Sequence, residues 1–302
     1  MREVTDRVVL AAFVTEAVLA GGNAVGVRFS NRELDPLWGA GFRFALAAAL
    51  LAALMIVLRL ALPRGPALVG VLLYGTLNFG LAFGLAYYAL VELHAGFGQL
   101  LLAIVPLVTL LLAVAERQES LRIGAVAGAV LAFAGIVVMS RAPLRESVPL
   151  SSLLAALGSA FCFAQAAIVV RRFPPVHPLT SNAVAMATGA AVLVVLSALV
   201  GESMQIPDRG ETWAALAYLV VVGSVVVFGL YVFVLRHWSA SRAAYLFSIT
   251  PVVTVLLSAW LDDEPIGAGL VVGGLLVLAG VYVGAIRPAH TEDAPAEAEP
   301  AR

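Results

Sequence analysis

The segment LLAIVPLVTLLLAVAERQES at residues 101–120 returns, without a gap, as LFSITPVVTVLLSAWLDDEP at residues 246–265. In this register Pro106 meets Pro251, and Glu119 meets Glu264. The match extends over residues 90–140 and 235–285, where three glycines also coincide: Gly124, Gly128 and Gly135 with Gly269, Gly273 and Gly280. Apolar segments share leucine and valine by chance, but seldom a proline, an acid and three glycines in one register. We interpret the match as an internal duplication.

The composition indicates that lipid solvates most of this chain. Hydrophobic residues make up 62% of the sequence and charged residues only 12%. A soluble domain needs about a quarter of its residues charged to cover its surface. The net charge of -1 points to no particular partner, and we expect none among nucleic acids.

Apolar runs and short polar links alternate along the chain. Each run has about the length that crosses a hydrocarbon core of about 30 Å, and backbone groups in lipid must be satisfied within the segment, which favours helices. The sequence therefore predicts an all-α integral membrane protein with ten transmembrane helices. They lie at roughly Val8–Phe29, Leu37–Leu60, Pro66–Leu90, Ala95–Ala115, Ile123–Ser140, Ser151–Val170, Pro178–Val200, Thr212–Leu235, Ala243–Leu261 and Ile266–Ile286.

The duplication divides these helices into two units of five, at residues 8–140 and 151–286, followed by an acidic tail at 287–302 that is expected to be disordered and cytoplasmic. Arginines gather in alternate links, and their distribution places both termini in the cytoplasm. Because five is odd, the second unit must enter the membrane the opposite way up. Two inverted five-helix repeats are typical of secondary transporters, whose substrate site lies near the midplane where the halves meet.

Several motifs resemble those of the EamA family in the drug/metabolite transporter superfamily. Each half has a mid-helix proline followed by an acidic loop, at residues 116–119 and 262–265. The first helix carries Gly21-Gly22-Asn23, similar to the family's tryptophan-glycine-polar-asparagine signature with Ala20 in place of the tryptophan, and Arg43-Phe44 is similar to the second-helix pattern. The resemblance covers about residues 8–286. It implies a multi-pass exporter of small metabolites or amino acids in the inner (plasma) membrane, working by alternating access through a central cavity.

Only Glu16 and Arg43 are ionisable groups lying clearly within a span, and neither is repeated in the second half. Such groups tend to mark pathways, partners or proton relays. Glu16 could be a proton or cationic-substrate site, or else a permanently neutral acid or one that reaches the interface. For Arg43 a structural role, as a partner of Glu16 or of carbonyl groups, is favoured over a counter-charge for a substrate carboxylate.

Neutral polar residues are further candidates for the pathway. Asn23 and Gln165 occupy matching places in the two halves, which suits a midplane cavity as well as it suits hydrogen bonding between helices. Weaker candidates are Asn78, Gln99 and Tyr245. Tyrosines such as Tyr87 fit the aromatic belts at the membrane interfaces better than a cavity.

Pro106 and Pro251 are predicted to lie mid-helix, where each removes a backbone hydrogen bond and can bend its helix. Their symmetric placement favours hinges for alternating access over static kinks. The spacings Gly124…Gly128 and Gly269…Gly273 allow close helix contact, either within the bundle or across a homodimer.

Signals for an enzyme are weak in this sequence. It contains no phosphate-binding loop and no zinc-ligand spacing, and its four histidines stand singly, so we expect no cofactor and no metal. An integral-membrane enzyme acting on a lipid is the alternative to a transporter. It would need several polar catalytic groups near one interface, and the sequence shows no such cluster.

Overall fold

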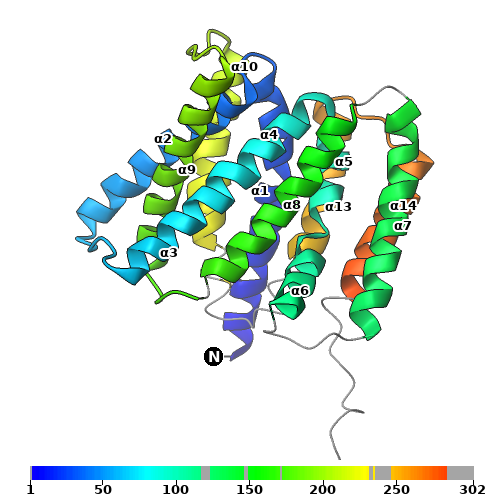
Figure 1. Cartoon of the computed structure of the whole chain (residues 1–302), viewed down its shortest axis with the longest axis horizontal. Helices are drawn as coiled ribbons and strands as arrows, with labels where there is room; N and C mark the ends of the chain where they lie inside the picture. Colours follow the sequence, from blue (N-terminus) through cyan, green and yellow to red (C-terminus); the bar gives the residue numbers. More distant parts are fainter. Residues whose placement is uncertain are drawn as a thin grey trace, which may run out of the picture.

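The computed structural model describes residues 2–116, 123–145, 149–170, 172–230, 234 and 246–283. The regular secondary structure of this part of the chain is helical throughout (Figure 1). In chain order the elements are α1 (Arg2–Asn31), α2 (Pro36–Val57), α3 (Pro66–Tyr74), η1 (Gly75–Ala82), α4 (Phe83–Glu92), α5 (Ala95–Leu102), α6 (Val105–Ala115), α7 (Ile123–Arg145), α8 (Leu150–Val170), α9 (Pro178–Val200), α10 (Gly210–Ala217), η2 (Tyr218–Val226), α13 (Leu246–Leu261) and α14 (Ala268–Val281).

The helices form one bundle in which elements from the two halves of the chain pack side by side. The closest pairs are α2 with α9 and α7 with α14, both visible in Figure 1. The first helix, α1, packs against η2 and α13 of the second half, whereas α8 packs against α3, η1, α4 and α6 of the first half. The core of the bundle is therefore built largely between halves rather than within each.

The glycines of the duplicated segment lie at the contact between α7 and α14. A Cβ atom on Gly135 would come within 2.6 Å of the carbonyl oxygen of Gly273, and one on Gly280 within 2.6 Å of that of Gly128. Such distances leave no room for a side chain. Of the two glycine spacings considered for a packing seam or a homodimer, Gly128 and Gly273 therefore lie at a contact between helices of the same chain.

Both third spans of the halves contain a π-helical segment, η1 and η2, within an otherwise α-helical run. The fourth span of the first half departs from the expected single helix, because turn residues at Ala103 and Ile104 separate α5 from α6. Pro106 consequently lies in the first turn of α6, where the missing N–H has no helical partner to lose. The mid-helix position predicted for Pro106 is wrong, while that predicted for Pro251, inside α13, is confirmed.

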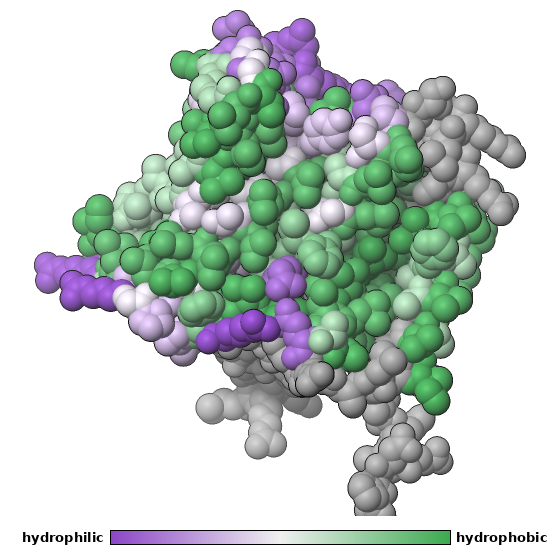
Figure 2. All heavy atoms as spheres, viewed as in Figure 1, coloured by the Kyte–Doolittle hydropathy of each residue, from purple (hydrophilic) through white to green (hydrophobic). Residues whose placement is uncertain are grey.

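The outside of the bundle is strongly apolar. Seven helices of the described chain are long and apolar enough to cross a membrane, and three shorter apolar helices accompany them at 126–138, 250–261 and 268–281. Figure 2 shows hydrophobic residues across the middle of one face, with hydrophilic residues gathered toward its upper end and lower edge. This distribution is that of a multi-pass membrane protein.

Carboxylates join the two halves at the upper end of the bundle, which holds the links 32–35, 93–94, 201–209 and 262–267 (Figure 1). Glu202 accepts hydrogen bonds from the backbone N–H groups of Leu37 and Trp38 at 3.1 and 2.8 Å. Glu264 accepts them from Gly96 and Phe97 at 2.8 and 3.2 Å. Each acid therefore accepts from free N–H groups in the first turn of a helix of the other half. Glu202 does so for α2 and Glu264 for α5.

Two further carboxylates, Asp262 and Glu33, also join the halves at this upper end. Asp262 pairs with Arg28 and, at 2.7 Å, with Arg32. Glu33 accepts hydrogen bonds from the backbone N–H groups of Asp208 and Arg209 at 2.6 and 3.2 Å. Together with the Thr212 side chain, these donors hold the pKa of Glu33 below its usual value.

We predict that Glu33→Gln lowers the melting temperature of the detergent-solubilised protein at pH 7 and that this difference disappears in acid. Because the pKa of Glu33 is lower in the folded than in the unfolded protein, its stabilising effect is present above the ordinary glutamate value, about 4.3, and is lost as the pH falls through the lowered pKa. The measurement is thermal unfolding of both proteins between pH 7 and pH 3. Glu211→Gln, which changes an exposed carboxylate in α10, is the control. A difference that is independent of pH, or equal in the control, would contradict the prediction.

Candidate substrate site

Arg43 is a fully buried arginine near the middle of the bundle. It lies in the second turn of α2, and its exposed fraction is 0%. The rings of Phe44 and Phe83 lie near the guanidinium, with 5.0 and 5.4 Å between its central carbon and the ring centroids. Removing a full charge from water is costly unless the charge is paired and hydrogen-bonded, so the partners of Arg43 decide what this site can do.

The hydrogen-bond partners of Arg43 are neutral and come from both halves of the chain. Its Nε and Nη2 donate to Ser224 Oγ, each at 3.4 Å, and Nη2 also donates to the Gly223 carbonyl at 3.5 Å. Its Nη1 donates to the hydroxyl oxygen of Tyr87 in α4 at 3.4 Å. No ion pair among the described residues includes Arg43. These long hydrogen bonds orient the guanidinium without neutralising it.

Ser224 and Gly223 are positioned by the π-helical segment η2. Ser224 Oγ donates to the Leu219 carbonyl five residues earlier, at 2.9 Å, and so presents its lone pairs to Arg43. A Cβ atom on Gly223 would overlap Asn23 Oδ1 and lie 3.2 Å from Arg43 Nη2. Because Gly223 has no side chain, Asn23 of α1 and Arg43 of α2 can both lie against its backbone. π-Helical segments often occur at functional sites.

Asn23 therefore lies close to Arg43 at this candidate site. Its Oδ1 atom is buried and has no hydrogen-bond partner among the described residues. Tyr218, also in η2, lies one turn of α1 away and donates its hydroxyl hydrogen to the Leu19 carbonyl. The site thus combines one cation, one free amide oxygen and the hydroxyls of Tyr87 and Ser224 in an apolar surround, a mixture typical of small-molecule sites.

A cavity of about 320 Å³ touches this site at Ser224. Its other lining residues come from α2, from the start of α9 and from the residues around the end of η2, and include Leu54, His177, Asn182 and Phe228. The volume is within the range of small-ligand pockets.

Glu16 is buried but stands apart from Arg43. Its exposed fraction is 1%, and neither carboxyl oxygen has a hydrogen-bond partner among the described residues. It precedes Asn23 by two turns of α1, about 10 Å along the helix axis. Of the two kinds of partner considered for Arg43, Glu16 is therefore not one, whereas a backbone carbonyl, that of Gly223, is.

The other residues expected to line a pathway lie elsewhere. Gln165 donates to Glu116 at the end of α6 at 3.2 Å, and Glu116 also pairs with Arg172. The structure thus does not bring Gln165 together with Asn23. Asn78 is nearly buried in η1, and Gln99 is half-buried in α5. Tyr245 lies outside the described residues.

Sequence reasoning missed two members of the site and misjudged a third. Ser224 and Gly223 gave no signal, because a Gly-Ser pair in an apolar run is ordinary in membrane helices. Tyr87 was assigned to an interface belt, yet it is fully buried against Arg43. The charge of Arg43 was the available signal, since an intramembrane cation needs partners and they can be sought among polar residues of other spans.

An apolar helical bundle with a small, mostly apolar cavity between α2, α9 and η2 is the architecture expected of a membrane transporter. The model of the EamA-like transporter family matches residues 7–141 and 150–285, and the chain belongs to this family.

Several similar proteins are named as transporters or efflux pumps. The chain is 25% identical to YedA, an uncharacterized inner membrane transporter of Escherichia coli K12, over 82% of this chain and 80% of YedA. It is 26% identical to a probable amino-acid metabolite efflux pump of Salmonella typhimurium, over 88% of this chain and 91% of the pump. A crystal structure that is 20% identical has the same fold, with a TM-score of 0.65, and the match covers 92% of this chain and 96% of the other.

We predict that Gly223→Ala lowers the melting temperature of the protein in detergent. The added methyl group must displace Asn23 or Arg43, and overpacking of this kind costs about 1–3 kcal/mol. Gly229→Ala is the control, since a Cβ atom there meets no atom of the described residues within 4 Å. Combining Gly223→Ala with Asn23→Ala should cost less than the sum of the two single changes, because the smaller residue makes room for the methyl group. Equal melting temperatures for Gly223→Ala and Gly229→Ala would refute the arrangement.

Proposed function

We propose that this chain is a secondary transporter that exports small metabolites or amino acids by alternating access. Its ten spans form two inverted five-helix repeats, at residues 8–140 and 151–286, and both termini lie in the cytoplasm. The observation that carries the proposal is the buried Arg43, which has only neutral partners and is held between the two halves.

The packing supports the inverted repeat. The second helix of each unit packs on the second helix of the other, α2 on α9, and the fifth on the fifth, α7 on α14. The first helices exchange partners, because α1 contacts the third and fourth spans of the second unit while α8 contacts those of the first. Such reciprocal contacts are expected of two similar units related by a two-fold axis in the membrane plane. The seven long and three shorter apolar helices agree in number with the ten proposed spans.

A substrate carboxylate would supply the charge that Arg43 lacks. A guanidinium binds a carboxylate strongly because the hydrogen bonds are charge-assisted and can be bidentate. Tyr87 and Ser224 orient the guanidinium, and the free Oδ1 of Asn23 could accept a hydrogen bond from an ammonium or hydroxyl group of the same molecule. Amino acids combine these groups, in agreement with the name of the efflux-pump relative.

The difference between the two ends of the bundle fits the state in which an exporter takes up its substrate from the cytoplasm. The cavity lined by Ser224 is also lined by His177 and Pro178, which lie at the end of the bundle where α1 begins, while contacts of Glu33, Glu202, Asp262 and Glu264 join the two halves at the opposite end. With both termini in the cytoplasm, the site loads from the cytoplasm. Opening the other end requires those contacts to break, and Pro251, inside α13, is the hinge nearest to Asp262 and Glu264 in the sequence.

Glu16 is proposed as the proton-carrying group. A carboxyl group that is buried without a partner is stable only when neutral, and a change in its surroundings during alternating access would allow it to release a proton. Its place on α1, the helix that also carries Asn23, gives a direct connection between protonation and the substrate site.

Arg43→Gln is expected to reduce uptake of carboxylate substrates into proteoliposomes by roughly 10–100-fold, because a hydrogen bond to a charged group contributes about 1.5–3 kcal/mol. Counterflow of labelled amino acids, measured over a panel, gives the readout. Arg43→Lys should retain part of the activity, and Arg64→Gln, at an exposed arginine outside the bundle, should retain all of it. Wild-type counterflow by a folded Arg43→Gln protein would remove Arg43 from the substrate site.

Glu16→Gln is expected to abolish proton coupling while leaving counterflow. Glutamine resembles the protonated acid but cannot release a proton. In inverted vesicles the wild-type protein should dissipate an imposed pH gradient when a substrate is added, and the variant should not. Substrate-dependent loss of the gradient by Glu16→Gln would show that protons do not pass through this residue.

A further inference from the structure

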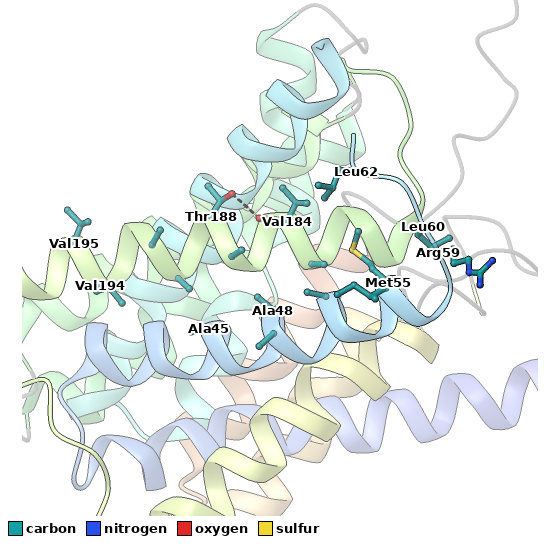
Figure 3. Close-up of a pocket in the computed structure, with 17 residues that line it drawn as sticks. Ala45, Ala48, Met55, Arg59, Leu60, Leu62, Val184, Thr188, Val194 and Val195 are labelled. Atoms are coloured by element: carbon teal, nitrogen blue, oxygen red, sulfur yellow. Dashed lines mark hydrogen bonds between the residues drawn. The ribbon is translucent and has the colours of Figure 1, made fainter. Parts of the chain in front are cut away.

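A groove of about 1240 Å³ runs along the outside of the bundle between α2 and α9. Alanines from both helices line much of it, among them Ala48, Ala52 and Ala187, and valine, leucine, isoleucine and methionine side chains line most of the rest. The one polar side chain between the helices, Thr188, donates its hydroxyl hydrogen to the Val184 carbonyl at 2.8 Å and so offers no free donor. Figure 3 shows the groove with Val194 and Val195 at one end and Arg59 at the other. It is separate from the Arg43 site.

The dimensions of the groove suit a single acyl chain. From Ala45 to Met55 it follows α2 for ten residues, about 15 Å. That distance is half of a hydrocarbon core of about 30 Å, which is the depth of one leaflet. The groove therefore extends from near the middle of the bilayer to the end of α2.

Arg59 stands where the headgroup of such a lipid would lie. The chain reverses there, since Leu60 N–H donates to the Met55 carbonyl at 3.0 Å and Arg59 has a φ of 50°. Glycine or asparagine usually occupies a left-handed position after a helix, because other side chains are strained there. In the described part of the chain Arg59 forms no ion pair. A strained and unpaired arginine at the mouth of an apolar groove suggests a ligand for its charge.

We propose that this groove binds one anionic phospholipid, with an acyl chain against the alanines and the phosphate on Arg59. Basic residues beside clefts between membrane helices attract anionic headgroups. A second copy of this chain fits less well. Two copies in the same membrane orientation would face groove to groove, leaving both hollows unfilled and bringing two Arg59 side chains into the same leaflet.

The test is native mass spectrometry of the detergent-purified protein titrated with phosphatidylglycerol or phosphatidylcholine. We expect one tightly held phosphatidylglycerol per protein. Arg59→Asn should weaken it roughly fivefold, the effect of one interfacial arginine, and Arg59→Gly should do the same while relieving the backbone strain. Both variants should leave phosphatidylcholine unchanged. Arg64→Asn, five residues along the same link, is the matched control and should have little effect.

A groove-filling variant tests the apolar part. Ala52→Leu combined with Ala187→Leu changes two exposed alanines, so the fold should be retained while the acyl chain is excluded, and binding of both lipids at this site should be lost. Equal weakening by Arg59→Asn and Arg64→Asn would overturn the proposal in favour of general attraction to a basic surface. Wild-type lipid retention by the filled variant would overturn it as well. A protein dimer that the filled variant abolishes would assign the groove to a second copy of the chain.

Discussion

A guanidinium held away from water between two halves of one chain is the constraint on which this structure depends. Arg43 comes from the first half, and the atoms that fix it, Ser224 Oγ and the Gly223 carbonyl, come from the second. A buried charge with neutral partners is stable only while the surrounding dipoles stay in place. The bundle must therefore hold α2 against η2 accurately, and the close approach allowed by Gly223 is what permits it.

At the upper end of the bundle, the free N–H groups of helix N-termini must also find hydrogen-bond partners. Helix N-termini carry free N–H groups and a partial positive charge, which are expensive to leave unsatisfied near lipid. Glu202 and Glu264 supply acceptors to α2 and α5, and each is in the opposite half from the helix that it serves. The same two glutamates therefore satisfy the free N–H groups of these helices and connect the two halves of the chain.

Much of the architecture could be predicted, because duplication, apolar run length and helix formation in lipid are properties of local sequence. An all-helical membrane protein followed from these, and the resemblance of several motifs to those of the EamA family indicated the family. The helix break before Pro106 could not be predicted, since a proline fits both a kinked helix and a helix start. Tyr87 and Ser224 were missed because their roles depend on contact with Arg43 across distant parts of the sequence. Polar residues in a span show that partners exist, but only the packing shows which ones.

The exchange of helix caps also bears on how the two halves could change after duplication. If a single five-helix unit once paired with an identical copy, the carboxylates at its helix N-termini would have come from that copy. Here Glu202 and Glu264 belong to the second half and serve the first, while Glu33 of the first half serves the second. A substitution of any of these glutamates therefore removes hydrogen bonds from the half of the chain that does not contain it. The two halves therefore depend on each other at these positions, whereas residues that face lipid carry no such constraint.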